Sequence, residues 1–172
     1  MRESDPHGVP FRGVRMCYDS EKSYDELVAA LLADVGKEPV PIDDLGATTA
    51  GWDDYEAAVQ PHAGPRGFML FGLFNHGGWI KKAGIDRKVL RTIIGNPLIA
   101  ITMLRHDVTA GLFAPVELLL LEQDGDRSSL IYVKPSSLMV VEDNPALLAA
   151  AEELDAKLAA LAAKVTAWRP NA

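Results

Sequence analysis

The clearest pattern of apolar positions lies near the C-terminal end of the chain. Apolar residues recur there at alternating spacings of four and three, which places them on one face of an α-helix. They are Leu147, Ala151, Leu154, Leu158, Leu161 and Val165. Asn144 suits the N-cap position and Pro145 the first turn. The pattern predicts one long helix that packs across a sheet, with a coiled coil as the alternative.

The N-terminal part of the chain predicts a strand followed by a helix. Apolar and other residues alternate over residues 11–18, as in a strand with one buried face. Ser23 and Glu26 then have the spacing of a capping box. Apolar residues at helical spacing follow them, so we expect a helix over about residues 24–35.

Two central strands each end at a corner that leads into a helix. The dense apolar run 67–74 predicts a buried strand, followed by Asn75-His76-Gly77-Gly78 and a short helix. Residues 89–94 predict another strand, after which Gly95-Asn96-Pro97 opens a second helix with Asn96 as its N-cap. We expect the two corners to converge and to wall off a shared hollow.

A hairpin follows these corners. Residues 116–122 and 130–134 have the apolar content of strands, and Asp124-Gly125-Asp126-Arg127 between them is typical of a tight turn. The two strands should therefore pair antiparallel.

Residues 36–66 differ from the rest in composition. Prolines, glycines and aspartates alternate here, and the pattern leaves room for one short helix over about residues 52–59. We interpret this segment as an insertion or lid. Trp52 and Tyr55, three apart on that helix, could clamp a ligand or pin the segment onto the body.

The composition is that of an ordinary globular protein. Its 172 residues are 48% hydrophobic and 24% charged, which predicts a single α+β domain over residues 1–172. The net charge of −7 argues against nucleic acid as a partner, and no apolar run is long enough to cross a membrane. The N-terminus lacks the apolar stretch of a secretory signal, so we expect a cytoplasmic protein. The single cysteine, Cys17, is predicted to be a buried thiol, with a nucleophile as the alternative.

Several short motifs occur in an order that resembles the bacterial domain-of-unknown-function family 302. They are GFMLFGLFNHGG at 67–78, Gly95-Asn96-Pro97, TAGLFAP at 109–115, the hairpin and the alanine-leucine tail. The resemblance covers about residues 11–35 and 67–166. It implies a small antiparallel sheet with helices packed on one face, a TATA-binding-protein-like arrangement, and usually a homodimer. It implies no known reaction.

The corner at Asn75, His76 and Gly77 carries the best single candidate for chemistry. An imidazole that borders a cavity could titrate near neutral pH and act as a general acid or base. His76 also resembles the histidine that family members carry after this strand. The alternative is that His76 caps the adjacent helix.

The second corner offers an anion site. Backbone N–H groups after Pro97 could bind an anion or carboxylate together with Asn96, or Asn96 could only cap its own helix. His106 and Asp107 close that helix, and we count both among the candidate ligand-binding residues. With His76 they would suit a metal ion, but the spacing lacks a metal motif, so we predict no metal.

Tyr132 and Lys134 are the last candidates. Alternate residues of a strand share a face, so both side chains could point into one cleft, or they could be ordinary cross-strand surface residues. The chain has no phosphate loop, dinucleotide fingerprint, CxxC pair or nucleophile elbow, so we expect no cofactor.

These patterns favour a dimeric module that binds a small molecule, anionic or aromatic. One alternative is a small enzyme without a cofactor, in which His76 is the acid or base and Asn96 or Tyr132 stabilises charge. The other is an interaction module in which the C-terminal helix presents Leu154, Leu158 and Leu161 to a partner.

Overall fold

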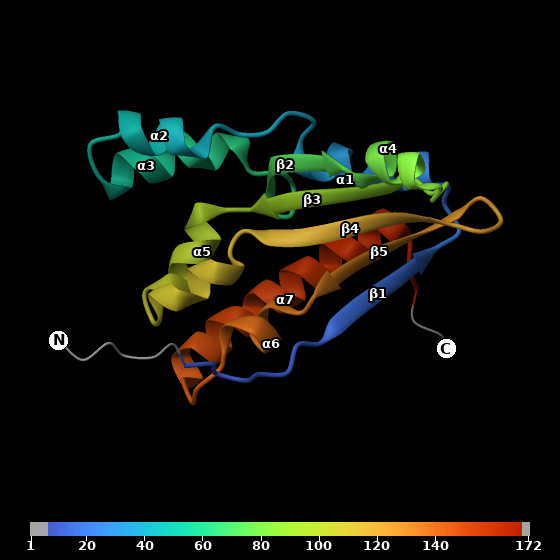
Figure 1. Cartoon of the computed structure of the whole chain (residues 1–172). Helices are drawn as coiled ribbons and strands as arrows, with labels where there is room; N and C mark the ends of the chain where they lie inside the picture. Colours follow the sequence, from blue (N-terminus) through green and yellow to red (C-terminus); the bar gives the residue numbers. More distant parts are fainter. Residues whose placement is uncertain (1–6, 170–172) are drawn as a thin grey trace.

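The computed structural model describes residues 7–169 and shows one antiparallel sheet of five strands in the order β1-β5-β4-β3-β2 (Figure 1). The strands are β1 (Arg15–Ser20), β2 (Met69–Asn75), β3 (Val89–Gly95), β4 (Val116–Gln123) and β5 (Arg127–Val133). The helices are α1 (Tyr24–Val35), α2 (Ile42–Thr48), α3 (Trp52–Val59), α4 (His76–Ile80), α5 (Pro97–Leu104), α6 (Pro135–Met139) and α7 (Pro145–Thr166). Short 3₁₀ helices span Gln60–His62, Lys81–Ala83 and Val108–Phe113. The predicted α+β class with an antiparallel sheet and a long C-terminal helix is confirmed; the TATA-binding-protein-like description stays a prediction.

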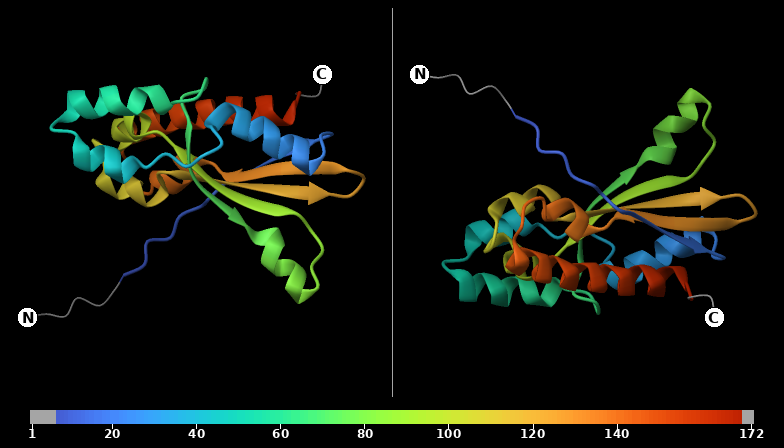
Figure 2. Two further views of the ribbon diagram at one scale, coloured as in Figure 1. Left: turned by 90° about the horizontal axis from the view of Figure 1, so that it is seen from above. Right: turned by 90° about the horizontal axis from the view of Figure 1, so that it is seen from below.

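One face of the sheet carries the core. Helices α1, α2, α3, α5 and α7 lie on the same side of the sheet (Figure 2). Leu118 and Leu120 of β4 and Leu130 of β5 point toward them and are fully buried. Because alternate residues of a strand face opposite sides, this pattern assigns Leu119 and Leu121 to the opposite face.

The periodic residues of α7 belong to this core. Leu147, Ala151, Leu154, Leu158, Leu161 and Val165 are all buried, and α7 contacts β1 and β5. Packing across the sheet is thus confirmed. The alternative in which Leu154, Leu158 and Leu161 face a partner is wrong, because the chain's own sheet and helices cover them.

The opposite face of the sheet has no helix packed across it in the described part of the chain. α4 and the segment before β1 project on this side without covering it (Figure 2). Cys17 of β1 is exposed rather than buried as expected, because it lies on this face and not on the side of Tyr18. None of the helices within residues 7–169 combines the length and hydropathy that a membrane-spanning helix needs.

The segment 36–66 contains two helices where one was predicted. α3 has the expected bounds, but α2 was not predicted because Pro39, Pro41 and Gly46 suggested a loop. α2 uses Pro41 before its first turn, where a proline is tolerated, and Asp43 and Asp44 occupy that turn. The two helices lie beside α5 at one end of the sheet (Figure 1).

Candidate functional site

The two corners expected to converge lie at opposite ends of one strand pair. β2 and β3 are antiparallel neighbours: Met69 pairs with Gly95, and Asn75 pairs with Leu90. Asn75 lies six residues after Met69 along β2, a distance of about 20 Å in an extended strand. The predicted shared hollow is therefore wrong, because an antiparallel pairing moves the end of β2 away from the end of β3.

The first corner, Asn75 to Gly78, is closed by its own hydrogen bonds. The Asn75 side-chain oxygen accepts from the Gly78 N–H at 3.1 Å and caps α4. His76 Nδ1 accepts from Trp79 Nε1 at 3.3 Å, and the two rings meet edge to face. Gly77 has no room for a side chain, since an added Cβ would lie 3.0 Å from the Arg87 carbonyl oxygen. The structure thus places Asn75, His76 and Gly77 on a projecting arm formed by α4 and the loop to β3 (Figure 2).

His106 and Asp107 follow α5, at the end of the sheet opposite this arm (Figure 1). Asp107 accepts hydrogen bonds from the Thr109 hydroxyl at 2.7 Å and the Thr109 N–H at 2.8 Å, and these bonds lower the pKa of its carboxyl. His106 is exposed and its carbonyl oxygen accepts from Asn144 Nδ2 at 3.4 Å. Within residues 7–169, no three histidine, cysteine, aspartate or glutamate side chains lie close enough to hold a metal ion.

Tyr132 and Lys134 do share a face, but it is the face beneath α7. Tyr132 is 4% exposed and stacks on Tyr18 with ring centroids 6.0 Å apart. Burial raises the pKa of the Tyr132 phenol, and the neighbouring Tyr18 and Asp155 raise it further. Lys134 Nζ lies 3.5 Å from an Asp155 carboxylate oxygen. Tyr132 therefore belongs to the core and Lys134 reaches Asp155 of α7, and their proposed roles in a ligand site stay predictions.

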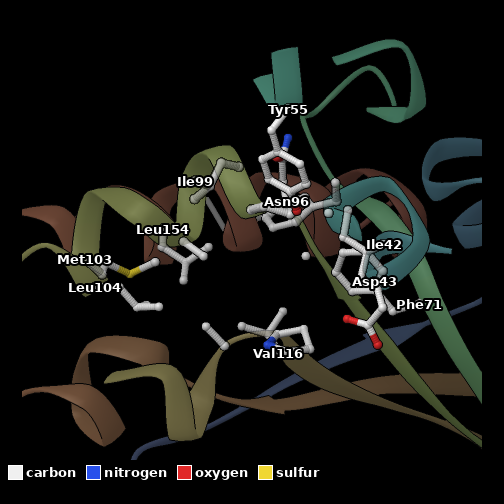
Figure 3. A pocket seen from close by; sticks show the side chains of 17 residues that line it. Ile42, Asp43, Tyr55, Phe71, Asn96, Ile99, Met103, Leu104, Val116 and Leu154 are labelled. Atoms are coloured by element: carbon white, nitrogen blue, oxygen red, sulfur yellow. The ribbon is translucent and has the colours of Figure 1, made fainter. Parts of the chain in front are cut away.

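The second corner borders a large pocket. Its volume is about 610 Å³, which is within the usual range for small-molecule sites. The pocket lies between α5, the end of β3, the start of β4, and the two helices of segment 36–66 (Figure 3). It is lined by Ile42, Asp43, Gly46, Tyr55, Phe68, Phe71, Gly95, Asn96, Pro97, Ile99, Ala100, Met103, Leu104, Ala114, Pro115, Val116 and Leu154.

One face of α5 forms a wall of the pocket. Pro97, Ala100 and Leu104 recur at spacings of three and four, so they share one side of the helix, with Ile99 and Met103 beside them. Leu154 of α7 and Val116 of β4 close the pocket below α5 (Figure 3). These walls are apolar and come from parts of the chain far apart in sequence.

The segment 36–66 supplies the opposite wall. α2 contributes Ile42, Asp43 and Gly46, and α3 contributes Tyr55 (Figure 3). Tyr55 is half-buried, and burial followed by the Asp43 charge raises the pKa of its phenol. Trp52 contacts Tyr55 with ring centroids 5.9 Å apart but remains exposed. Of the two aromatic residues considered as a clamp, only Tyr55 lines the pocket.

The helix start at Asn96 is fully hydrogen-bonded. The Asn96 side chain accepts from the Leu98 N–H and donates to the Gly67 carbonyl, both at 2.8 Å. The Ile99 and Ala100 N–H groups bond to the Asn96 carbonyl at 3.0 and 2.9 Å, and Pro97 has no N–H. Asn96 therefore caps its helix, and the free donors expected there for an anion are absent from this turn.

Sequence reasoning placed the corner Gly95-Asn96-Pro97 at a hollow and considered Tyr55 as part of a clamp, but it named none of the other pocket residues as candidate ligand contacts. The sequence of α5 is apolar on every side, because four apolar residues, Leu98 to Ile101, follow each other. The pattern therefore does not show which side of the helix faces a pocket. A pocket built from apolar side chains leaves no local pattern that differs from a core. The one usable signal was the unusual composition of segment 36–66 beside an apolar helix.

Comparison with known proteins agrees with this fold. A crystal structure of an uncharacterised conserved protein DUF302 from Bacillus stearothermophilus is 18% identical, with a TM-score of 0.62, and the match covers 88% of this chain and 97% of that one. A search of the curated proteins finds no match to this chain. The family model described as Domain of unknown function DUF302 matches residues 46–165, which include α3 and exclude β1 and α1. The chain belongs to this family.

Proposed function

We propose that this protein binds an apolar small molecule in the pocket between α5 and the helices α2 and α3. The observation that carries the proposal is the pocket itself: about 610 Å³ lined almost entirely by aliphatic and aromatic side chains. Apolar concave sites with few polar groups are typical of small-molecule binding. His76 lies at the other end of the β2–β3 pair, so general acid or base chemistry by His76 is not part of this proposal.

Filling the pocket tests the proposal. Ala100 lies in the middle of the α5 wall, and Ala100→Phe should place a ring in the space that a ligand would occupy. The probes are the neutral dye Nile red, whose binding is measured by fluorescence, and octanol, whose binding is measured by calorimetry. We expect the affinity for each probe to fall by at least about tenfold, because the new ring removes apolar surface that the probe would bury.

Thr102→Phe is the matched control, because Thr102 lies on the exposed side of the same helix and does not line the pocket. It should leave binding of both probes unchanged. If neither probe binds the parent protein, or if both variants bind equally well, the pocket is not a binding site and the proposal is overturned.

We also propose that the protein is a homodimer joined through the open face of the sheet. The residues assigned to this face by strand alternation include Ile93, Leu119, Leu121, Ile131 and Val133, and Leu119 pairs directly with Ile131. Arg91 and Glu117 form an ion pair on the same face, and the aliphatic side chains around that pair are only partly buried within the chain. Covering these aliphatic side chains would remove apolar surface from water. Two copies of one face can meet about a two-fold axis, the commonest arrangement of homodimers.

The dimer proposal predicts that a charged substitution on the open face halves the mass of the particle in solution. Leu119→Glu places a charge in the centre of the open face and should convert dimers to monomers in sedimentation equilibrium. Leu148→Glu, on the exposed side of α7, should leave the dimer intact. If the parent protein sediments as a monomer at every concentration, the dimer proposal is wrong.

A further inference from the structure

We propose that the pocket selects apolar molecules that carry an amine over apolar molecules that carry a carboxylate. This inference rests on the proposed binding function and assigns the chemical class of its ligand. It follows from the charges and hydrogen-bond donors around the pocket.

The first observation is the set of charges on the pocket wall. Among the described residues that line the pocket, Asp43 is the one with a carboxylate, and none is a lysine, arginine or histidine. Asp43 forms no ion pair with another described side chain. A protonated amine that entered the pocket would meet an unneutralised carboxylate, whereas a carboxylate ligand would meet only repulsion.

The second observation is the position of that carboxylate. Asp43 is exposed, and it lies on the side of the pocket formed by Ile42 and Phe71, across from Met103 and Leu104 (Figure 3). A molecule with its apolar part against α5 could therefore keep a charged end near Asp43 and in contact with water. Tyr55 lies on the same wall of segment 36–66, where burial and then the Asp43 charge raise the pKa of its phenol, so at neutral pH it is a hydrogen-bonding group without charge.

The third observation is that the N-terminus of α5, the other place where an anion could bind, has its N–H groups already hydrogen-bonded. A helix N-terminus at a pocket usually attracts anions through free N–H groups. At α5 the side chain and carbonyl of Asn96 already accept from Leu98, Ile99 and Ala100. An anionic ligand would find no free backbone donor at this turn and no positive side chain among the residues of 7–169 that line the pocket.

Three ligands that differ only in their polar group test the inference. Octylamine, octanol and octanoate share one apolar chain, and calorimetric titration at neutral pH measures each affinity directly. We expect octylamine to bind on the order of tenfold more tightly than octanoate, with octanol between them. The difference is modest because Asp43 is exposed, so water weakens both its attraction for the amine and its repulsion of the carboxylate. The difference should shrink at high salt.

Asp43→Asn and Asp44→Asn form a matched pair of variants. Both residues lie in the first turn of α2, but only Asp43 lines the pocket. Asp43→Asn should bring the affinities of octylamine and octanoate to within about twofold, and Asp44→Asn should keep most of the difference. Octanol binding should be unchanged in both, which shows that the pocket is intact.

The octanol measurement separates this inference from the proposed function. If octanol binds but octanoate binds as tightly as octylamine, or if Asp43→Asn keeps the full selectivity, the inference is overturned while the binding function stands. If none of the three ligands binds, both fall.

Discussion

Replacing Gly64 by alanine is expected to lower the free energy of unfolding by about 3 kcal/mol or more, as for other forced backbone clashes in a packed region. A Cβ added at Gly64 would lie 1.8 Å from the backbone oxygen of Asp34, at the end of α1. A backbone oxygen cannot rotate away as a flexible side chain can. The two chain segments would have to separate, and the change should be measured by urea denaturation followed by circular dichroism.

Two bonds explain why this separation is costly. The Gly64 N–H donates to the Phe68 carbonyl at 2.8 Å, and Arg66 forms an ion pair with Asp34 at 2.6 Å. Asp34 is buried, so a displaced Arg66 would leave a carboxylate without its partner inside the protein. Together these contacts hold the end of segment 36–66 against α1 and so position the pocket wall.

Gly46→Ala is the matched control for this prediction. The nearest atom to an added Cβ at Gly46 is a ring carbon of Tyr55 at 3.9 Å, an ordinary contact distance. Gly46 lies inside α2, where alanine is favoured over glycine by roughly 0.5–1 kcal/mol. We expect this variant to be as stable as the parent or slightly more stable. Equal losses in the two variants would contradict the close packing described at Gly64.

The elements with local signals were predictable from the sequence. α1 begins at the capping box of Ser23 and Glu26, in which each residue bonds to the backbone of the other. α7 begins at Asn144, and its apolar stripe is the buried side of the helix. In these cases residues three or four apart determine both the start of the helix and the face that it buries.

The relative placement of the elements was not predictable in the same way. Nothing in the residues around Asn75 or Gly95 specifies that β2 and β3 are adjacent and antiparallel, yet that pairing separates the two corners. The pairing of β3 with β4 sets Gly95 beside the start of β4, since Ile94 pairs with Val116. The pocket forms there because α5 leaves the sheet at this end and segment 36–66 returns to it.

The chemistry of the candidate site was predictable only in part. Asn96 was correctly identified as an N-cap, because the order Asn-Pro before an apolar run is a local signal. Whether its helix start was open to an anion depended on the hydrogen bonds of the first turn. Asp43 received no prediction, because an aspartate near a proline is typical of loops, and its place beside a pocket depends on the packing of α2 on α3 and of α3 on α5.

Replacing Leu158 by alanine is expected to cost about 2–5 kcal/mol of unfolding free energy, the range for a leucine truncated in a packed core. Leu158 is 0% exposed and lies in the middle of α7, among the buried residues that link this helix to the sheet. The alanine would remove apolar contacts and leave a cavity that the sheet and helices can fill only in part. Urea denaturation of the two proteins measures the difference.

Leu148→Ala is the control on the same helix, because Leu148 is 39% exposed and lies off the buried stripe. It should change the free energy of unfolding by less than about 1 kcal/mol, since alanine is the better helix former and little packing is lost. If α7 instead presented its periodic leucines to a partner chain, Leu158→Ala would weaken association and leave the stability of the separate chain nearly unchanged. Because the sheet of the same chain covers Leu158, we expect the loss to appear in the unfolding of a single chain, at any protein concentration.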